Sequence, residues 1–209
     1  MLTAAELAWF SLASLLLVLT PGPNMIYCVS RALCQGRSAG IVSLAGVLVG
    51  FLVHLVAATL GLTALLAAVP FAFDAVRLAG AAYLLWLGCK AIFSRNLISF
   101  TPAARQPLRR VFATGLLSNV LNPKPGLFVV AFIPQFVAAQ RGSVPVQMLV
   151  YGAIFAVLTA VIFTALGCFA AQLSNALARR PRLVLWANIG AGLTFVAAGL
   201  SILALDRRR

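Results

Sequence analysis

The sequence predicts an all-α membrane protein with six transmembrane helices in an inverted three-plus-three repeat, the first helix of each half being broken by prolines. Three observations support this: 63% of the residues are hydrophobic and only 9% are charged, the apolar residues fall into six long runs, and two of these runs are interrupted by prolines. Soluble domains carry roughly 25% charged residues. Because so apolar a chain cannot hide its surface from water, lipid must be its solvent.

The apolar runs have the length of membrane spans, since about 20 helical residues cross the ~30 Å hydrocarbon core. We expect the spans at about 7–33, 40–69, 71–93, 111–139, 146–173 and 183–205. They form one transporter-sized domain, 1–209, with halves at 1–94 and 111–209 and a basic connecting loop at 95–110. Three spans per half is an odd number, so a second copy inserts upside down.

The first break lies at Thr20-Pro21-Gly22-Pro23-Asn24. Pro21 and Pro23 lack an N–H, which predicts that the carbonyls of Leu17 and Leu19 lose their helical partners, and Gly22 adds backbone freedom. Such groups are tolerated in a membrane only where they are buried in protein or line a wet cavity.

A half-helix beginning near Asn24 would turn its N-terminal amides and positive dipole end toward an anion such as a carboxylate. The alternative is that the break is a kink used for packing. The second break favours a functional role, because paired broken segments in two halves indicate a transporter's binding site.

The second break lies at Asn122-Pro123-Lys124-Pro125. By the same rule it predicts free carbonyls at Asn119 and Leu121, which could accept hydrogen bonds from an ammonium group or a water. Lys124 is either a pathway residue or a side chain that reaches the membrane interface. His54 is either a proton carrier or, as we favour, a helix–helix hydrogen-bond partner.

The sequence argues against several other classes of protein. It contains no phosphate-binding, hydrolase or metalloprotease motif, so we expect neither an enzyme nor a bound cofactor. The excess of basic residues follows the loops, which favours membrane topology over nucleic-acid binding. The N-terminus lacks the basic region of a cleavable signal. The cysteines have no metal-ligand spacing and read as small buried residues: Cys28, Cys34, Cys89 and Cys168.

Three motifs resemble signatures of the lysine exporter/homoserine–threonine resistance (LysE/RhtB) family. The first motif is the first break together with Ser30-Arg31-Ala32 and Gln35-Gly36-Arg37-Ser38-Ala39-Gly40. The second is the stretch Gly80-Ala81-Ala82-Tyr83-Leu84-Leu85-Trp86-Leu87-Gly88. The third is Asn122-Pro123-Lys124 together with Phe128 and Pro134-Gln135-Phe136. They are collinear and cover almost the whole chain. The resemblance implies a bacterial inner-membrane exporter of amino acids or close derivatives, coupled to protons by antiport. Some members carry an aspartate where this chain has Phe51, so an acidic proton relay is not expected there.

Asp74 is the one acidic residue in the predicted spans, and we expect it to pair locally near the start of the third span. No acidic residue is then available to bind a second positive charge, so we expect a neutral amino acid as substrate, bound between the two breaks. A membrane thiol–disulfide electron carrier and a passive channel are the alternatives, and the sequence leaves open whether the chain forms a homo-oligomer.

Nine arginines in the loops after spans one, three and five, against five elsewhere, predict that these loops are cytoplasmic and both termini are outside.

Overall fold

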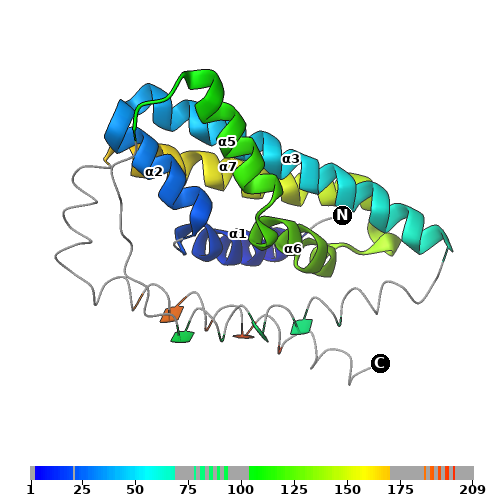
Figure 1. Cartoon of the computed structure of the whole chain (residues 1–209). Coiled ribbons are helices and arrows are strands. Elements are labelled where there is room, and N and C mark those ends of the chain that lie inside the picture. Colours follow the sequence, from blue (N-terminus) through cyan, green and yellow to red (C-terminus); the bar gives the residue numbers. More distant parts are fainter. Residues whose placement is uncertain are drawn as a thin grey trace.

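The computed structural model describes a large part of the chain, including both predicted breaks. The described residues are 3–20, 22–68, 78, 81–82, 85–86, 89, 92–93, 104–169, 186, 189–190, 193, 196–197 and 200. Within them the chain forms helices and no β-strand (Figure 1). The all-α prediction is therefore confirmed for this part of the molecule.

Six α-helices and two short 3₁₀-helices make up the described fold. In chain order they are α1 (Ala4–Leu19), α2 (Pro23–Gln35), α3 (Arg37–Ala68), α5 (Leu108–Val120), α6 (Pro123–Ala131), η1 (Ile133–Phe136), η2 (Ala139–Arg141) and α7 (Val144–Cys168). α3 and α7 are each long and apolar enough to cross a membrane. The pairs α1–α2 and α5–α6 qualify as bent spans, with bends of 59° and 49°, so the described residues hold two to four spans.

Local sequence signals explain where the helices begin and end. Thr3 and Glu6 form a capping box at the start of α1. α2 starts at Pro23, where the missing N–H has no cost because an N–H at this position has no partner within the helix. The helix ends before Gly36, whose φ is +89°. Asn122 caps α6.

The two predicted breaks are present, but some predicted boundaries are wrong. The α-helix of span four stops at Ala131 instead of continuing toward 139, and a 3₁₀-helix containing Pro134 follows it. In span five, α7 ends at Cys168, and residues 170–173 of the predicted span lie outside the described residues. Most of the predicted spans 71–93 and 183–205 lies outside the described residues, as does most of the stretch Gly80–Gly88 that carries the second motif.

α3 packs against α2, α5, α6 and α7 (Figure 1). Its closest approach is to α5. A Cβ atom added to Gly46 would overlap the backbone of Phe112 and come within 2.9 Å of Leu116 N. A Cβ on Gly50 would lie 2.7 Å from Asn119 Cβ. These glycines bring the two backbones into contact, as small residues do at membrane helix interfaces.

Aromatic side chains fill the interior where α1, α6, η1 and α7 meet. The Phe10 ring lies 4.7 Å from the Tyr151 ring and 5.7 Å from the Phe132 ring, measured between centroids. Phe128 stacks on Phe132 at 4.9 Å. These contacts tie the first half of span one to the second half of span four.

The two ends of the bundle are held by different polar contacts. At one end, Arg31 Nη1 donates to the carbonyl of Ala104 over 2.9 Å and Gln35 Nε2 donates to the carbonyl of Gln106 over 2.8 Å. These bonds join the α2–α3 junction to the segment before α5. At the other end, Glu6 in the first turn of α1 pairs with Arg141 of η2.

Candidate functional site

A pocket lies where the two breaks meet, and α3 and α7 complete its wall. Its empty volume, which includes the open mouth, is about 540 Å³. Its polar lining is Thr20, Asn24, Asn119, Asn122, Lys124 and Thr159. Its apolar lining is Leu17, Val18, Met25, Val47, Leu48, Phe51, Phe155 and Phe163, and Gly22, Pro23 and Pro125 complete it.

The start of α2 opens into this pocket without a side-chain cap. Gly22 is the N-cap residue and offers no side chain, and Pro23 has no N–H. The first helical bond runs from the N–H of Ile26 to the carbonyl of Gly22 over 3.0 Å. The N–H groups of Asn24 and Met25 therefore have no partner within the helix, and both residues line the pocket. An uncapped helix start of this kind attracts an anion.

The start of α6 differs from that of α2. The Asn122 side-chain oxygen accepts a hydrogen bond from the N–H of Lys124 over 3.0 Å, so this helix start is capped by its own sequence. The two breaks are alike in sequence, but only the first leaves its helix start without a side-chain cap.

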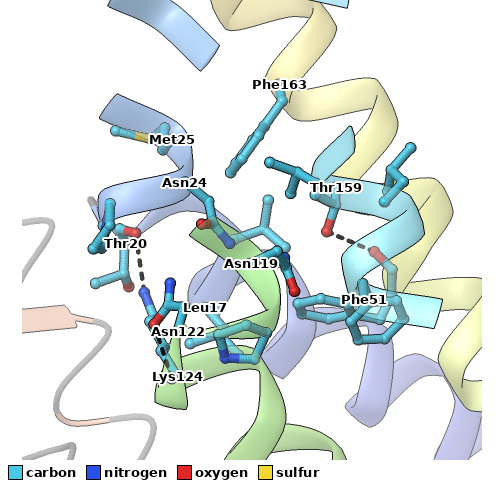
Figure 2. A pocket seen from close by; sticks show the side chains of 17 residues that line it. Leu17, Thr20, Asn24, Met25, Phe51, Asn119, Asn122, Lys124, Thr159 and Phe163 are labelled. Atoms are coloured by element: carbon cyan, nitrogen blue, oxygen red, sulfur yellow. Dashed lines mark hydrogen bonds between the residues drawn. The ribbon is translucent and has the colours of Figure 1, made fainter. Parts of the chain in front are cut away.

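Lys124 extends from the second break to the first. Its ammonium Nζ donates to the carbonyl of Thr20 over 3.2 Å (Figure 2). A Cβ atom added to Gly22 would lie 3.5 Å from Nζ, so the ammonium sits beside the start of α2. Among the described residues that line the pocket, Lys124 is the one charged side chain. The pocket is therefore positive where the two breaks meet.

Asn119 places its side chain in the pocket and its carbonyl against α3. The carbonyl accepts from the N–H of Asn122 over 3.0 Å and lies 3.1 Å from His54 Nε2, which donates to it as a protonated ring nitrogen. With two donors already on this oxygen, its predicted role as a free acceptor is wrong. The side chain is only 2% exposed, and its oxygen Oδ1 is buried with no hydrogen-bond partner.

The structure brings together most of the predicted pathway residues. Gly22, Pro23, Asn24, Asn119, Asn122, Lys124 and Pro125 line the pocket. His54 and Leu121 are not among the described residues that line it: His54 lies against Gly126 and Asn119, and Leu121, directly after α5, is 78% exposed. Pro21 and the side chain of Pro123 lie outside the described residues.

One prediction about the first break needs correction. The carbonyl of Leu17 is not free, because the N–H of Thr20 donates to it over 3.2 Å as the last turn of α1 tightens. The carbonyl that meets the pocket's cation is instead that of Thr20.

Sequence reasoning missed the wall that α7 contributes. Phe155, Thr159 and Phe163 line the pocket at a spacing of four residues, which places them on one face of the helix. The Thr159 hydroxyl donates to the carbonyl of Phe155 over 2.8 Å, so its oxygen can still accept. A threonine between two phenylalanines at helical spacing was the available signal, but nothing local in the sequence says which face of an apolar helix turns inward.

Apolar helices of spanning length and a pocket between two broken spans define a multi-pass membrane transporter. The family model of the LysE type translocator matches residues 3–205. The chain therefore belongs to the LysE-type translocators, and the resemblance found in its motifs is confirmed.

Relatives from three bacteria cover different shares of the chain. A homoserine/homoserine lactone efflux protein of Salmonella typhimurium is 31% identical over 194 residues, which are 91% of this chain and 93% of the relative. An uncharacterized membrane protein of Vibrio cholerae is 29% identical over 192 residues. A leucine efflux protein of Klebsiella pneumoniae is 31% identical over 130 residues, or 61% of either chain. No solved structure matches the chain.

Proposed function

We propose that this protein exports neutral amino acids or close derivatives across the bacterial inner membrane in exchange for protons, and that its substrate site is the pocket between the two breaks. The observation that carries the proposal is the composition of the described lining of that pocket: one lysine, no acidic side chain and a wall of phenylalanines and aliphatic residues. Such a site suits a carboxylate with an apolar or weakly polar side chain. A cationic side chain would meet the Lys124 ammonium with no carboxylate to offset the repulsion.

The relatives support amino acids as the substrate class. Those named for a substrate are efflux proteins for homoserine and its lactone, or for leucine, and these amino acids carry no net charge on their side chains. Proton coupling is proposed from the family resemblance, and homo-oligomerisation stays open.

The helix contacts support the six-span inverted repeat that we propose for the whole chain. α1 and α2 both pack against α7, and α5 and α6 both pack against α3. If α1–α2–α3 corresponds to α5–α6–α7, each broken span packs on the unbroken helix of the other half. A pseudo-two-fold axis in the membrane plane requires this reciprocity.

Efflux from amino-acid-loaded cells tests the proposal. Cells that overproduce the protein are loaded with single amino acids, including leucine, homoserine, lysine and arginine, and efflux is followed with and without a protonophore. We expect efflux of neutral amino acids that the protonophore suppresses. Selective efflux of lysine or arginine would overturn the charge argument, and efflux that ignores the protonophore would favour a passive channel. Efflux of no amino acid would overturn the proposed function.

A further inference from the structure

We propose that the pocket binds the two ends of an amino acid at separate places: the α-carboxylate at Lys124 and the start of α2, and the α-ammonium at Asn119 Oδ1. The inference rests on the proposed function and narrows it to substrates with a free carboxylate, in contrast to the relative whose name includes homoserine lactone. Esters, amides and lactones of the same amino acids would then be poor ligands.

The carboxylate end follows from two kinds of donor that converge at the first break. The N–H groups of Asn24 and Met25 have no partner within α2, and Gly22 provides no side chain to cap them. The Lys124 ammonium carries three N–H groups, and the hydrogen bond described for it uses one, toward Thr20. Charge-assisted bonds from an ammonium and from helix-start amides are the strong partners of a carboxylate.

The ammonium end follows from the buried, unpartnered oxygen of Asn119. A buried polar atom without a hydrogen bond is unfavourable, and a ligand that donates to it removes this cost. Oδ1 can only accept hydrogen bonds, so the group that it recognises must be a donor. Figure 2 shows the Asn119 side chain among the other side chains that line the pocket, with the Lys124–Thr20 bond to one side.

α3 fixes the position of this side chain. Gly50 leaves room for Asn119 Cβ, which would lie 2.7 Å from a Cβ at that glycine. One turn further along α3, His54 Nε2 holds the Asn119 carbonyl at 3.1 Å. The backbone and the Cβ of Asn119 are thus held by the same face of α3, and Asn119 is one of the residues that line the pocket.

Other pockets and clusters in the described residues do not carry a comparable argument. The second pocket, between Arg37 and Cys168, holds no unpartnered buried polar side chain. The Arg31–Gln35 cluster bonds to the chain before α5 and keeps two buried atoms without a partner, Arg31 Nε and Gln106 Oε1, but neither residue lines either of these pockets.

Binding to the purified full chain tests the assignment with four probes: leucine, leucinamide, homoserine and homoserine lactone. Leucinamide and the lactone keep the amino group and lose the free carboxylate. We expect the wild-type protein to bind each amino acid roughly ten- to hundredfold more tightly than its neutral derivative, the range that a hydrogen bond to a charged group spans. Dissociation constants come from ligand-dependent shifts of the thermal unfolding midpoint.

Two variants separate the two ends. Lys124→Gln should reduce the preference for the free amino acids to within about threefold, since it removes only the carboxylate partner. Asn119→Leu, which replaces the amide with an apolar group of similar size, should weaken all four probes and leave the preference unchanged. Leu117→Ala, on the exposed side of α5, is the matched control and should bind as the wild type does.

The outcomes are separable from a failure of the proposed function. An unchanged preference in Lys124→Gln, or unchanged affinities in Asn119→Leu, would overturn the assignment while efflux of amino acids stands. Equal wild-type affinity for leucine and leucinamide would overturn it without any variant, even if a variant fails to fold. Binding of none of the four probes by a protein that exports leucine or homoserine would overturn it as well.

Discussion

At the scale of single residues, the Lys124 cation in the pocket and the backbone carbonyl at the first break stabilise each other. A lysine inside a membrane span is costly unless it has a partner. The carbonyl of Thr20 would accept from the N–H of Asn24 in a continuous helix, but the chain turns between α1 and α2. Lys124 donates to this carbonyl over 3.2 Å. The break therefore supplies the acceptor that makes the buried charge tolerable, and the charge satisfies the carbonyl that the break exposes.

His54 provides a test at this scale. Its bond to the Asn119 carbonyl links α3 to α5, so His54→Leu should lower the free energy of unfolding by about 1 kcal/mol, the typical net value of one hydrogen bond. His54→Gln can still donate from its amide and should lose less. Thermal unfolding in detergent measures both. The dependence of efflux on external pH should be the same in His54→Gln as in the wild type. A stable His54→Gln variant whose efflux no longer depends on external pH would instead show that His54 carries protons.

Local rules located both breaks but assigned the wrong atom at Asn119. A missing proline N–H is a property of a few adjacent residues, so the sequence was sufficient to place the breaks. The fate of the Asn119 carbonyl depends on His54, 65 positions away in the chain. The contribution of Phe155, Thr159 and Phe163 depends likewise on how α7 is rotated against α3. Such tertiary contacts leave no local signal in one sequence.

At the scale of helices, the contact between α3 and α5 is set by glycine. Gly46 and Gly50 on α3 face the backbone of α5, and Gly115 on α5 faces that of α3. Gly61 lies in the same helix, but a Cβ added there would meet no described atom within 4 Å. The same residue type thus has two different roles in one helix.

That difference gives a matched pair of substitutions. Gly46→Ala should lower stability by about 1–3 kcal/mol, the usual cost of overpacking, because the methyl group overlaps the Phe112 backbone. Gly61→Ala should leave stability unchanged or raise it slightly, since alanine is the better helix former. Thermal unfolding of the two variants side by side is the measurement. Equal midpoints would show that α3 and α5 are not in backbone contact.

The first break gives a second test on a helix. Replacing Pro21 and Pro23 together with alanine restores two backbone donors and should straighten the span. We expect the double variant to insert into the membrane, with stability equal to or above that of the wild type, and to lose efflux. Pro107→Ala, at the exposed start of α5, controls for loss of a proline elsewhere. Full efflux by the double variant would reduce the break to a packing kink.

At the scale of the whole molecule, charge is unevenly divided between the two ends of the described bundle. Hydrogen bonds from Arg31 and Gln35 to residues 104 and 106 place the α2–α3 junction beside the segment before α5. The arginines at or near this end are Arg31, Arg37, Arg105, Arg109 and Arg110. At the other end Arg141 is neutralised by Glu6.

This asymmetry predicts the orientation in the membrane. Cytoplasmic loops carry the excess of basic residues, so the arginine-rich end should face the cytoplasm and the start of α1 the opposite side. Reporter domains inserted after Gln106 and after Gly142 measure the two ends. The first should report a cytoplasmic location and the second an external one. A cytoplasmic reporter after Gly142 would reverse the orientation.

The backbone contact between α3 and α5 has a mechanical consequence. In an exporter that exposes its site to each side in turn, some helices must shift against others. α3 comes from the first half of the chain and α5 from the second, and there is no room for even a methyl group between them at Gly46. Sliding one past the other would force side chains into backbone, so the two helices move as one rigid body. We therefore expect that the moving parts of the transporter are not the two halves of its sequence, because the part that holds α3 and α5 combines spans from both.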